Sequence, residues 1–221
     1  MDVLWSGIVV PAFATFFVII DPVGLAPMFL TLTGHMPLKA RRRTAVRAVL
    51  LAFGVLLVFA LFGKQVLNFL GISLPAFRIA GGILLFVLAL EMLFERRSAR
   101  RKENVESAAH EHEEEDDDDD GELWVFPLGI PLLAGPGAIT SVILLMGAHA
   151  GKPAEQAIII AVLCAVLLAS LGLFILVTKF DHLISETASR AISRILGMIL
   201  AALAVQFVLT GLHSAGFAVV R

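Results

Sequence analysis

The pattern of hydrophobic and polar positions divides the chain into six apolar segments, separated by shorter polar stretches. About twenty apolar residues in a helix suffice to cross the hydrocarbon core of a bilayer, and each segment reaches that length. The pattern therefore predicts an all-α membrane protein with six transmembrane helices. The six segments are Val3–Thr33, Thr44–Gly63, Pro75–Phe94, Leu123–Ala150, Ala157–Val177 and Ile192–Phe217.

The first segment contains a break signal, Asp21-Pro22-Val23-Gly24, in which Asp21 is the segment's only charged residue from Val3 onwards. Proline removes a backbone donor and clashes with the preceding turn, and the residue before a proline avoids the helical region. Asp is nevertheless a good N-cap, and Pro fits the first position of a helix. The sequence therefore predicts one helix that ends near Ile20 and a second that begins at Pro22.

A second break signal, Gly135-Pro136-Gly137-Ala138, lies in the fourth segment. Gly135 is the predicted N-cap and has no side chain, so the N–H groups of the next turn lack a cap. A bare helix start favours an anion, and glycines let a ligand approach the backbone. Tight helix packing by small residues is the alternative explanation. Broken apolar segments at corresponding places in two halves of a chain point to a transporter binding site.

Four polar residues within the apolar segments are further candidates for the site or for helix packing. A carboxylate such as Asp21 near mid-membrane costs about 2.5–3.5 kcal/mol, so it is either a satisfied helix cap or a cap that also binds a cation. Thr140 and Ser141 follow the second break, where a hydroxyl more often bonds to its own helix than to a ligand. Gln206 is the only strongly polar side chain within the sixth segment, and it either bridges helices or lines a cavity.

Charged residues predict the orientation of the chain in the bilayer. Lys and Arg concentrate after the first, third and fifth segments, so the positive-inside rule places these loops in the cytoplasm and both termini outside it. The chain is 58% hydrophobic and 16% charged, far from the composition of a soluble domain. Its net charge of −2 sums basic helix ends and one acidic tract, and it predicts no nucleic-acid partner.

No motif predicts an enzyme, a metal site or a cofactor. The histidines are scattered near segment ends without metal-ligand spacing, and there is neither a nucleophile motif nor a phosphate-binding loop. A coupling ion, Na⁺ or H⁺, is left open by the sequence, and so is a homo-oligomer. The single cysteine, Cys164, excludes a disulfide within the chain.

Residues 96–122 form a charged, low-complexity stretch that ends in five consecutive Asp residues before Gly121. Such a block repels itself and buries no apolar surface, which predicts a disordered cytoplasmic linker. Metal binding by its His and carboxylate groups is the alternative. The linker separates two halves, 1–95 and 123–221. Each half has three apolar segments, an odd number, so the second half enters the membrane from the opposite side as an inverted-topology repeat.

The stretches FVIIDPVGLAPMF (17–29) and FPLGIPLLAGPGAIT (126–140), together with 194–197 and 204–212, resemble the MarC/SnatA family of integral membrane proteins. The resemblance covers nearly the whole chain except the linker. It implies a six-helix transporter with inverted repeats that carries small neutral amino acids such as glycine and alanine. It also implies a site between the two broken helices, formed by Asp21, Pro22, Val23, Gly24, Gly135, Pro136, Gly137 and Ala138.

The sequence thus supports one main hypothesis and two alternatives. The main hypothesis is a secondary transporter of small zwitterionic amino acids in the cell (inner) membrane, working by alternating access. In it, the substrate carboxylate meets the N–H groups of Gly137 and Ala138, and the ammonium lies near Asp21. The alternatives are an exporter of a cation or other small solute that uses Asp21, and a membrane scaffold that does not transport.

Overall fold

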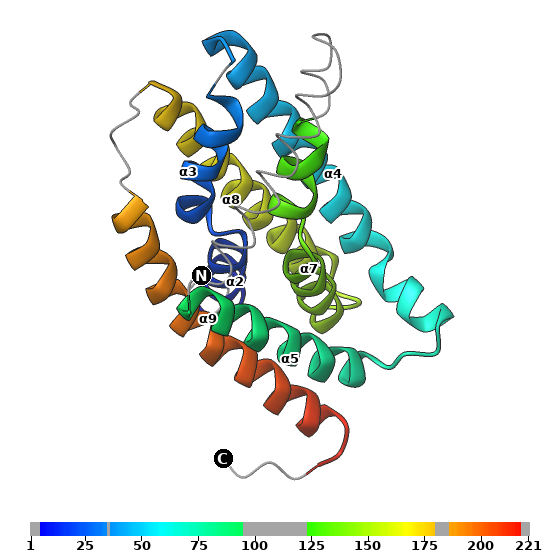
Figure 1. Cartoon of the computed structure of the whole chain (residues 1–221). Helices are drawn as coiled ribbons and strands as arrows, with labels where there is room; N and C mark the ends of the chain where they lie inside the picture. The colour runs from blue at the N-terminus through cyan, green and yellow to red at the C-terminus, as the bar shows by residue number, and fades with distance from the viewer. Residues whose placement is uncertain (1–4, 35, 95–122, 180–185, 218–221) are drawn as a thin grey trace.

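The structure is a computed structural model that describes residues 5–34, 36–94, 123–179 and 186–217. The regular elements in these ranges are all helices (Figure 1). The predicted linker at 96–122 lies outside the described residues. In chain order the helices, with η for a π-helix, are η1 (Trp5–Val9), α2 (Val10–Ile20), α3 (Pro22–Thr33), α4 (Leu38–Phe69), α5 (Leu74–Leu93), η2 (Trp124–Leu133), α7 (Pro136–Ala148), α8 (Pro153–Lys179) and α9 (Glu186–Ser214).

Five helical runs in the described ranges are long and apolar enough to cross a membrane. They are the run Gly7–Thr33, then α4, α5 and α8, and the Thr187–Ser214 part of α9. The fourth predicted segment differs, because its apolar α-helix is the shorter α7. The all-helical membrane class is therefore confirmed, with five long apolar helices where the sequence predicts six.

The irregular backbone of η2 explains this difference. Phe126 and Ile130 have extended dihedral angles, with φ −127° and ψ 130° at the first and φ −133° and ψ 128° at the second. Each of them precedes a proline, and a proline moves its predecessor out of the helical region. The fourth segment therefore begins with irregular turns and becomes an α-helix only at Pro136.

Helices α3 and α7 form the interior of the bundle. More than half of the residues of α3 are buried, and so are nearly all residues of α7 from Gly137 to Gly147. Helices α8 and α9 pack against α3, whereas α4 and α5 pack against α7. The rings of Phe29 in α3 and Phe174 in α8 stack with their centroids 4.7 Å apart. A helix that is apolar all round belongs in such an interior.

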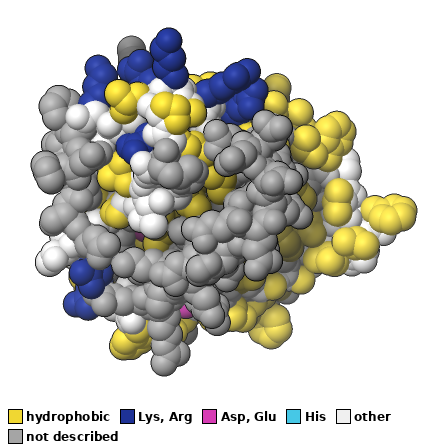
Figure 2. All heavy atoms as spheres, turned by 45° about the horizontal axis from the view of Figure 1, so that its top comes forward, with side chains coloured by type: hydrophobic (Ala, Val, Ile, Leu, Met, Phe, Trp, Pro, Cys, Tyr) yellow, Lys and Arg dark blue, Asp and Glu magenta, His cyan; other side chains and the backbone are white. Residues whose placement is uncertain are grey.

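The outer helices expose large apolar side chains, as lipid-facing helices do. Val58 and Phe62 of α4, Leu168 of α8 and Met198 of α9 are all more than half exposed. Contiguous apolar surface of this kind marks contact with a membrane or with another protein. Figure 2 shows apolar side chains along the flank of the molecule and Lys and Arg side chains gathered toward the edges of the same view.

Helices α5 and α9 pack more extensively than any other pair of the described helices, and they run antiparallel. Arg78 near the start of α5 donates from Nη1 to Ser214 Oγ at the end of α9, over 3.4 Å. Small residues let the two backbones approach. An added Cβ at Gly82 would lie 2.9 Å from the Ala204 carbonyl oxygen, and one at Gly197 would lie 3.2 Å from the Ala89 carbonyl oxygen. This is the small-residue packing typical of membrane helices.

Helix α4 begins at Leu38, six residues before the predicted segment. The basic residues predicted for the preceding loop therefore lie in its first turns. Arg41 Nε donates to the Met36 carbonyl over 3.0 Å, and the Arg47 guanidinium lies 5.7 Å from the ring centroid of Trp124. The first contact joins the preceding loop to the start of α4, and the second joins η2 to it.

Candidate functional site

The Asp21 junction, the single residue between α2 and α3, interrupts the helical backbone in the interior. Helix α2 ends at Ile20, and α3 begins at Pro22. Asp21 itself has left-handed angles, φ 54° and ψ 64°, and it is the only described non-glycine residue with a positive φ. Asp is one of the few side chains that tolerate this conformation. Its carboxylate Oδ1 accepts the N–H of Gly24 over 3.0 Å, which caps α3.

Two serines of α9 complete the Asp21 junction. Ser193 Oγ donates to the buried Asp21 carboxylate, at 3.1 Å from Oδ2 and 3.3 Å from Oδ1. One turn earlier, Ser189 Oγ donates to the Val23 carbonyl over 2.9 Å. In an α-helix that carbonyl would accept the N–H of residue 27, but Pro27 has none. Ser189 therefore satisfies a carbonyl that the proline leaves without its usual donor.

Gly24 is a glycine because the carboxylate and Ser193 occupy the space beside it. An added Cβ would overlap Asp21 Oδ2 and would lie 2.8 Å from Ser193 Oγ. Both atoms belong to short side chains that are held by hydrogen bonds, so neither can move away without breaking a contact. The polar side chains around position 24 therefore require a glycine there, and no unusual backbone conformation is involved.

The Gly135 junction, residues 134 and 135 between η2 and α7, has a different character. Gly135 is extended, with φ −77° and ψ 169°, and no side chain caps α7. Pro136 is exposed, whereas Gly137 and Ala138 are buried. An added Cβ at Gly137 would lie 3.0 Å from Leu88 Cδ2, 3.2 Å from Ile19 Cγ2 and 3.5 Å from Leu85 Cδ2. Apolar side chains therefore pack against the first turn of α7 in this conformation.

The two junctions are neighbours through Ile19, which lies against Gly137 and stands two residues before Asp21. The structure thus places the first turn of α7, at Gly137, against α2, the helix that ends at the Asp21 junction. Asp21, Pro22, Val23 and Gly24 belong to one junction, and Gly135, Gly137 and Ala138 to the other. Thr140 is buried and packs closely against Gly81 of α5. A Cβ added at Gly81 would lie 2.5 Å from Thr140 Cγ2. Gln206 is not brought to this group: it is exposed, and its Nε2 donates to Thr210 Oγ1 of its own helix over 3.3 Å.

Ser141 differs from the expectation that it bonds to its own helix. Its hydroxyl oxygen is fully buried and has no hydrogen-bond partner among the described residues. A buried polar group without a partner costs about 1–3 kcal/mol. Ser141 lies four residues after Gly137 and hence on the same face of α7. It adds an unsatisfied polar atom to the helix that begins at the Gly135 junction.

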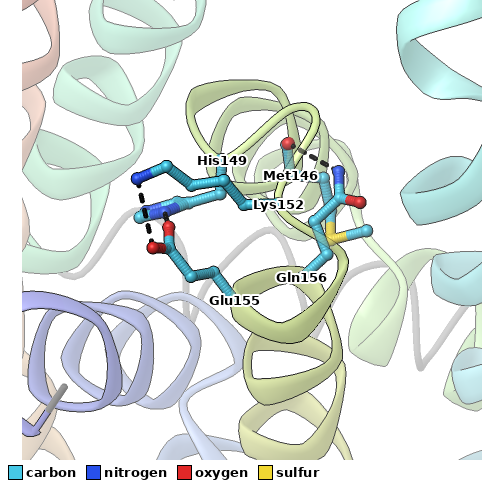
Figure 3. Close-up of polar contacts among 5 residues, drawn as sticks. All are labelled: Met146, His149, Lys152, Glu155 and Gln156. Atoms are coloured by element: carbon cyan, nitrogen blue, oxygen red, sulfur yellow. Dashed lines mark hydrogen bonds and ion pairs between the residues drawn. The ribbon is translucent and has the colours of Figure 1, made fainter.

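The far end of α7 is fastened to α8 by polar contacts (Figure 3). His149 Nδ1 lies 2.6 Å from Glu155 Oε2, and Lys152 Nζ lies 3.1 Å from Glu155 Oε1. Gln156 Nε2 donates to the Met146 carbonyl over 3.2 Å. Helix α7 is thus held by charged and polar groups at its end and by apolar packing at its start. No group of three or more His, Cys, Asp or Glu that could hold a metal ion occurs among the described residues.

Sequence reasoning missed Ser189 and Ser193. A signal for Ser189 is present, because Pro27 deprives the Val23 carbonyl of its donor and a proline in a membrane helix calls for a hydroxyl from a neighbour. The spacing of the two serines, four residues apart, places them on one helix face. Nothing local to either stretch indicates that α9 and α3 meet.

Long apolar helices around a buried carboxylate define an integral, multi-pass membrane protein. The chain belongs to the MarC family: the family profile described as "MarC family integral membrane protein" matches residues 6–215. This confirms the resemblance in the sequence, and the family description names no enzymatic activity.

Curated relatives extend over nearly the whole chain. A UPF0056 membrane protein of Methanocaldococcus jannaschii is 37% identical over 205 residues, covering 92% of this chain and 95% of the relative. The UPF0056 membrane protein YvbG of Bacillus subtilis is 32% identical, covering 92% and 93%. YhcE of Escherichia coli, also a UPF0056 membrane protein, is 31% identical, covering 90% and 89%. No solved structure matches the chain.

Proposed function

We propose that this protein is a secondary transporter that carries small neutral amino acids, of the glycine and alanine class, across the cell membrane by alternating access. The observation that carries the proposal is a pair of helix starts that are linked through Ile19 of α2. One bears the buried Asp21 carboxylate, and the other has no side-chain cap. A zwitterion has one charged group for each of these two environments.

The chemistry of the two helix starts supports an assignment of each end of the substrate. The substrate ammonium lies near the Asp21 carboxylate, because opposite charges attract more strongly where water is largely excluded. The substrate carboxylate meets the first N–H groups of α7, at Gly137 and Ala138, where the helix dipole favours an anion. Ser141, with its unpartnered hydroxyl one turn further along α7, supplies another polar contact.

The packing around Gly137 supports a small substrate. Leu88, Ile19 and Leu85 all approach the position of a Cβ at Gly137 within 3.5 Å. A ligand that approaches the Gly137 backbone from the side of this Cβ position has to displace the ends of these side chains, and a larger ligand displaces more of them. We therefore assign this packed arrangement to a closed state of the transport cycle, in which the site opens by movement of the surrounding helices.

The helix contacts support an inverted repeat of residues 1–95 and 123–221, with 96–122 as the linker. Exchange of the halves pairs α3 with α7, α4 with α8 and α5 with α9. Under this exchange the contact of α3 with α8 corresponds to that of α7 with α4, and the contact of α3 with α9 corresponds to that of α7 with α5. The α4–α8 and α5–α9 contacts map onto themselves. The positive-inside rule, applied to the three basic loops, places both termini outside the cytoplasm. Reporter fusions at Arg221 test this orientation, and a cytoplasmic signal there contradicts it.

The direct test is uptake of labelled amino acids by the purified protein in lipid vesicles, with an imposed Na⁺ or H⁺ gradient. We expect uptake of glycine and alanine that exceeds uptake of large amino acids and that depends on one of the gradients. Vesicles without the protein are the control. If neither amino acid enters under either gradient, the proposal is wrong.

Export of a cation is the second candidate, because Asp21, Ser193 and the Val23 carbonyl with Ser189 form a cluster of oxygen atoms. Oxygen ligands of this kind suit hard cations. Flux of labelled monovalent and divalent cations through the same vesicles, in the absence of any amino acid, distinguishes the two functions.

A further inference from the structure

The two serines of α9 contact the same turn of α3 but serve different groups. Ser189 donates to the backbone carbonyl of Val23 over 2.9 Å, and Ser193 donates to the side chain of Asp21 over 3.1 Å. Because the two serines are one turn apart on one helix, the first bond fixes where the second hydroxyl lies. The first contact completes a helix, whereas the second touches the charged group of the site.

The Gly24 N–H and the Ser193 hydroxyl contact the Asp21 carboxylate in different ways. The Gly24 N–H reaches Oδ1 and belongs to the same turn as Asp21, so it caps the helix without fixing both oxygens. Ser193 comes from another helix and lies within 3.3 Å of both oxygens. Asp21 and Ser193 are both buried, at 2% and 8% exposure, so water has little access to the contact.

Helix α9, which carries Ser193, is packed tightly against α5. Its glycines Gly197 and Gly211 pack against backbone atoms of α5, and Arg78 of α5 bonds to Ser214 near its end. Polar groups act most reliably when rigid elements and further hydrogen bonds hold them. The Ser189–Val23 bond then joins this helix to α3 and places the Ser193 hydroxyl beside Asp21.

We propose that Ser193 is a positioning residue of the binding site, whose hydroxyl fixes the Asp21 carboxylate in the orientation that receives the substrate ammonium. This inference rests on the proposed transport of small amino acids. It adds α9 to the two junctions as a third element of the site. Ser189, by contrast, completes the hydrogen bonding of α3 and does not act on the carboxylate.

The test measures the concentration dependence of alanine uptake in vesicles for Ser193→Ala, Ser193→Thr and Ser170→Ala. Ser170 is the matched control, because its buried hydroxyl bonds only to Val166 of its own helix among the described contacts. We expect Ser193→Ala to raise the KM for alanine about tenfold or more, as the loss of a hydrogen bond to a charged group does. The maximal rate per inserted protein should stay within about twofold, since the loss concerns binding.

Two further results sharpen the test. Ser193→Thr keeps the hydroxyl and should restore the KM of the parent, whereas Ser170→Ala should leave it unchanged. Binding of propionate, which lacks the ammonium, should not respond to Ser193→Ala. If Ser193→Ala fails to accumulate in the membrane, Ser193→Cys repeats the measurement with a side chain of similar size and a weak donor.

The failures are distinguishable. An unchanged KM in a Ser193 variant, beside a parent protein that transports alanine, overturns the role of Ser193 and leaves the proposed function intact. Absence of alanine uptake by the parent overturns both. An equal weakening of alanine binding and propionate binding in Ser193→Ala also overturns the inference, because Ser193 would not then act through the Asp21 carboxylate.

Discussion

The helices that begin at the Asp21 and Gly135 junctions differ in whether a side chain caps their first N–H groups. The start of α3 is satisfied: a left-handed Asp caps it, and two serines of α9 supply further donors. The start of α7 has no side-chain cap, and leucine and isoleucine side chains pack against its first turn at Gly137. A fully satisfied polar cluster specifies one arrangement, whereas apolar side chains can repack with less loss. The comparison supports the proposal that the first junction binds the charged ammonium and that a ligand displaces apolar side chains at the second.

The largest effect that separates the junctions is expected for Gly24→Ala. The added Cβ would overlap the Asp21 carboxylate, so alanine uptake should be abolished and the free energy of unfolding should fall by about 1–3 kcal/mol. Gly54→Ala and Gly172→Ala are matched controls in apolar helices, because nothing lies within 4 Å of a Cβ at either position. Uptake kinetics and thermal unfolding in detergent measure both quantities. Normal uptake by Gly24→Ala would contradict the close contact.

A smaller effect is expected for Gly137→Ala at the second junction. Its Cβ would meet only the ends of flexible apolar side chains at 3.0–3.5 Å, so the loss of stability should be smaller than for Gly24→Ala. Gly137→Val, with a stiff branched side chain, should abolish uptake while the protein still inserts. If Gly137→Val transports normally, the ligand does not bind there. If it fails to accumulate, close packing is the reason for the glycine.

The third prediction concerns the carbonyl that Pro27 leaves without a donor. Ser189→Ala should lower the free energy of unfolding by about 1–3 kcal/mol, because the Val23 carbonyl then lacks a partner. Pro27→Ala supplies a backbone N–H for that carbonyl, so Ser189→Ala should have a smaller effect in the Pro27→Ala background. A double-mutant cycle measured by unfolding in detergent checks this. Additive effects would show that Ser189 and Pro27 are unrelated.

The smallest effect is expected for deletion of residues 111–120, which lie outside both junctions and outside the described ranges. Uptake of alanine and membrane abundance should both be unchanged. Loss of uptake at normal abundance would instead assign a regulatory or metal-binding role to the acidic tract.

Local sequence rules account for the Asp21 junction in detail. Helix α2 ends at Ile20 and α3 begins at Pro22, the residues that the proline and N-cap rules single out, and the carboxylate makes the predicted cap. The same rules, applied to Phe126 and Ile130 before their prolines, would also have indicated the irregular backbone of η2. The prediction of a sixth long span relied on the length of the apolar segment and did not take these two prolines into account.

The contacts made by α9 could not be predicted in this way. Ser193 and Asp21 are 172 positions apart, and apolar patterning does not say which faces of two membrane helices meet. The packing at Gly137 is similar: the uncapped start of α7 follows from the sequence, whereas its apolar neighbours come from α2 and α5. Gln206 shows that a polar residue in an apolar span does not always mark a site, because its side chain bonds to Thr210 of its own helix.

The central claim is that Asp21 binds the ammonium of a small amino acid, and Asp21→Asn tests it most directly. Asn also caps helices and tolerates the left-handed conformation, so the variant removes the charge and keeps the oxygen that caps α3. Equilibrium binding of alanine and propionate to the purified parent and variant is the measurement. We expect the variant to bind alanine more weakly by about 3–5 kcal/mol, two or more powers of ten, and to lose most of the preference for alanine over propionate. Unchanged binding of alanine by Asp21→Asn would contradict the claim and leave Asp21 as a helix cap alone.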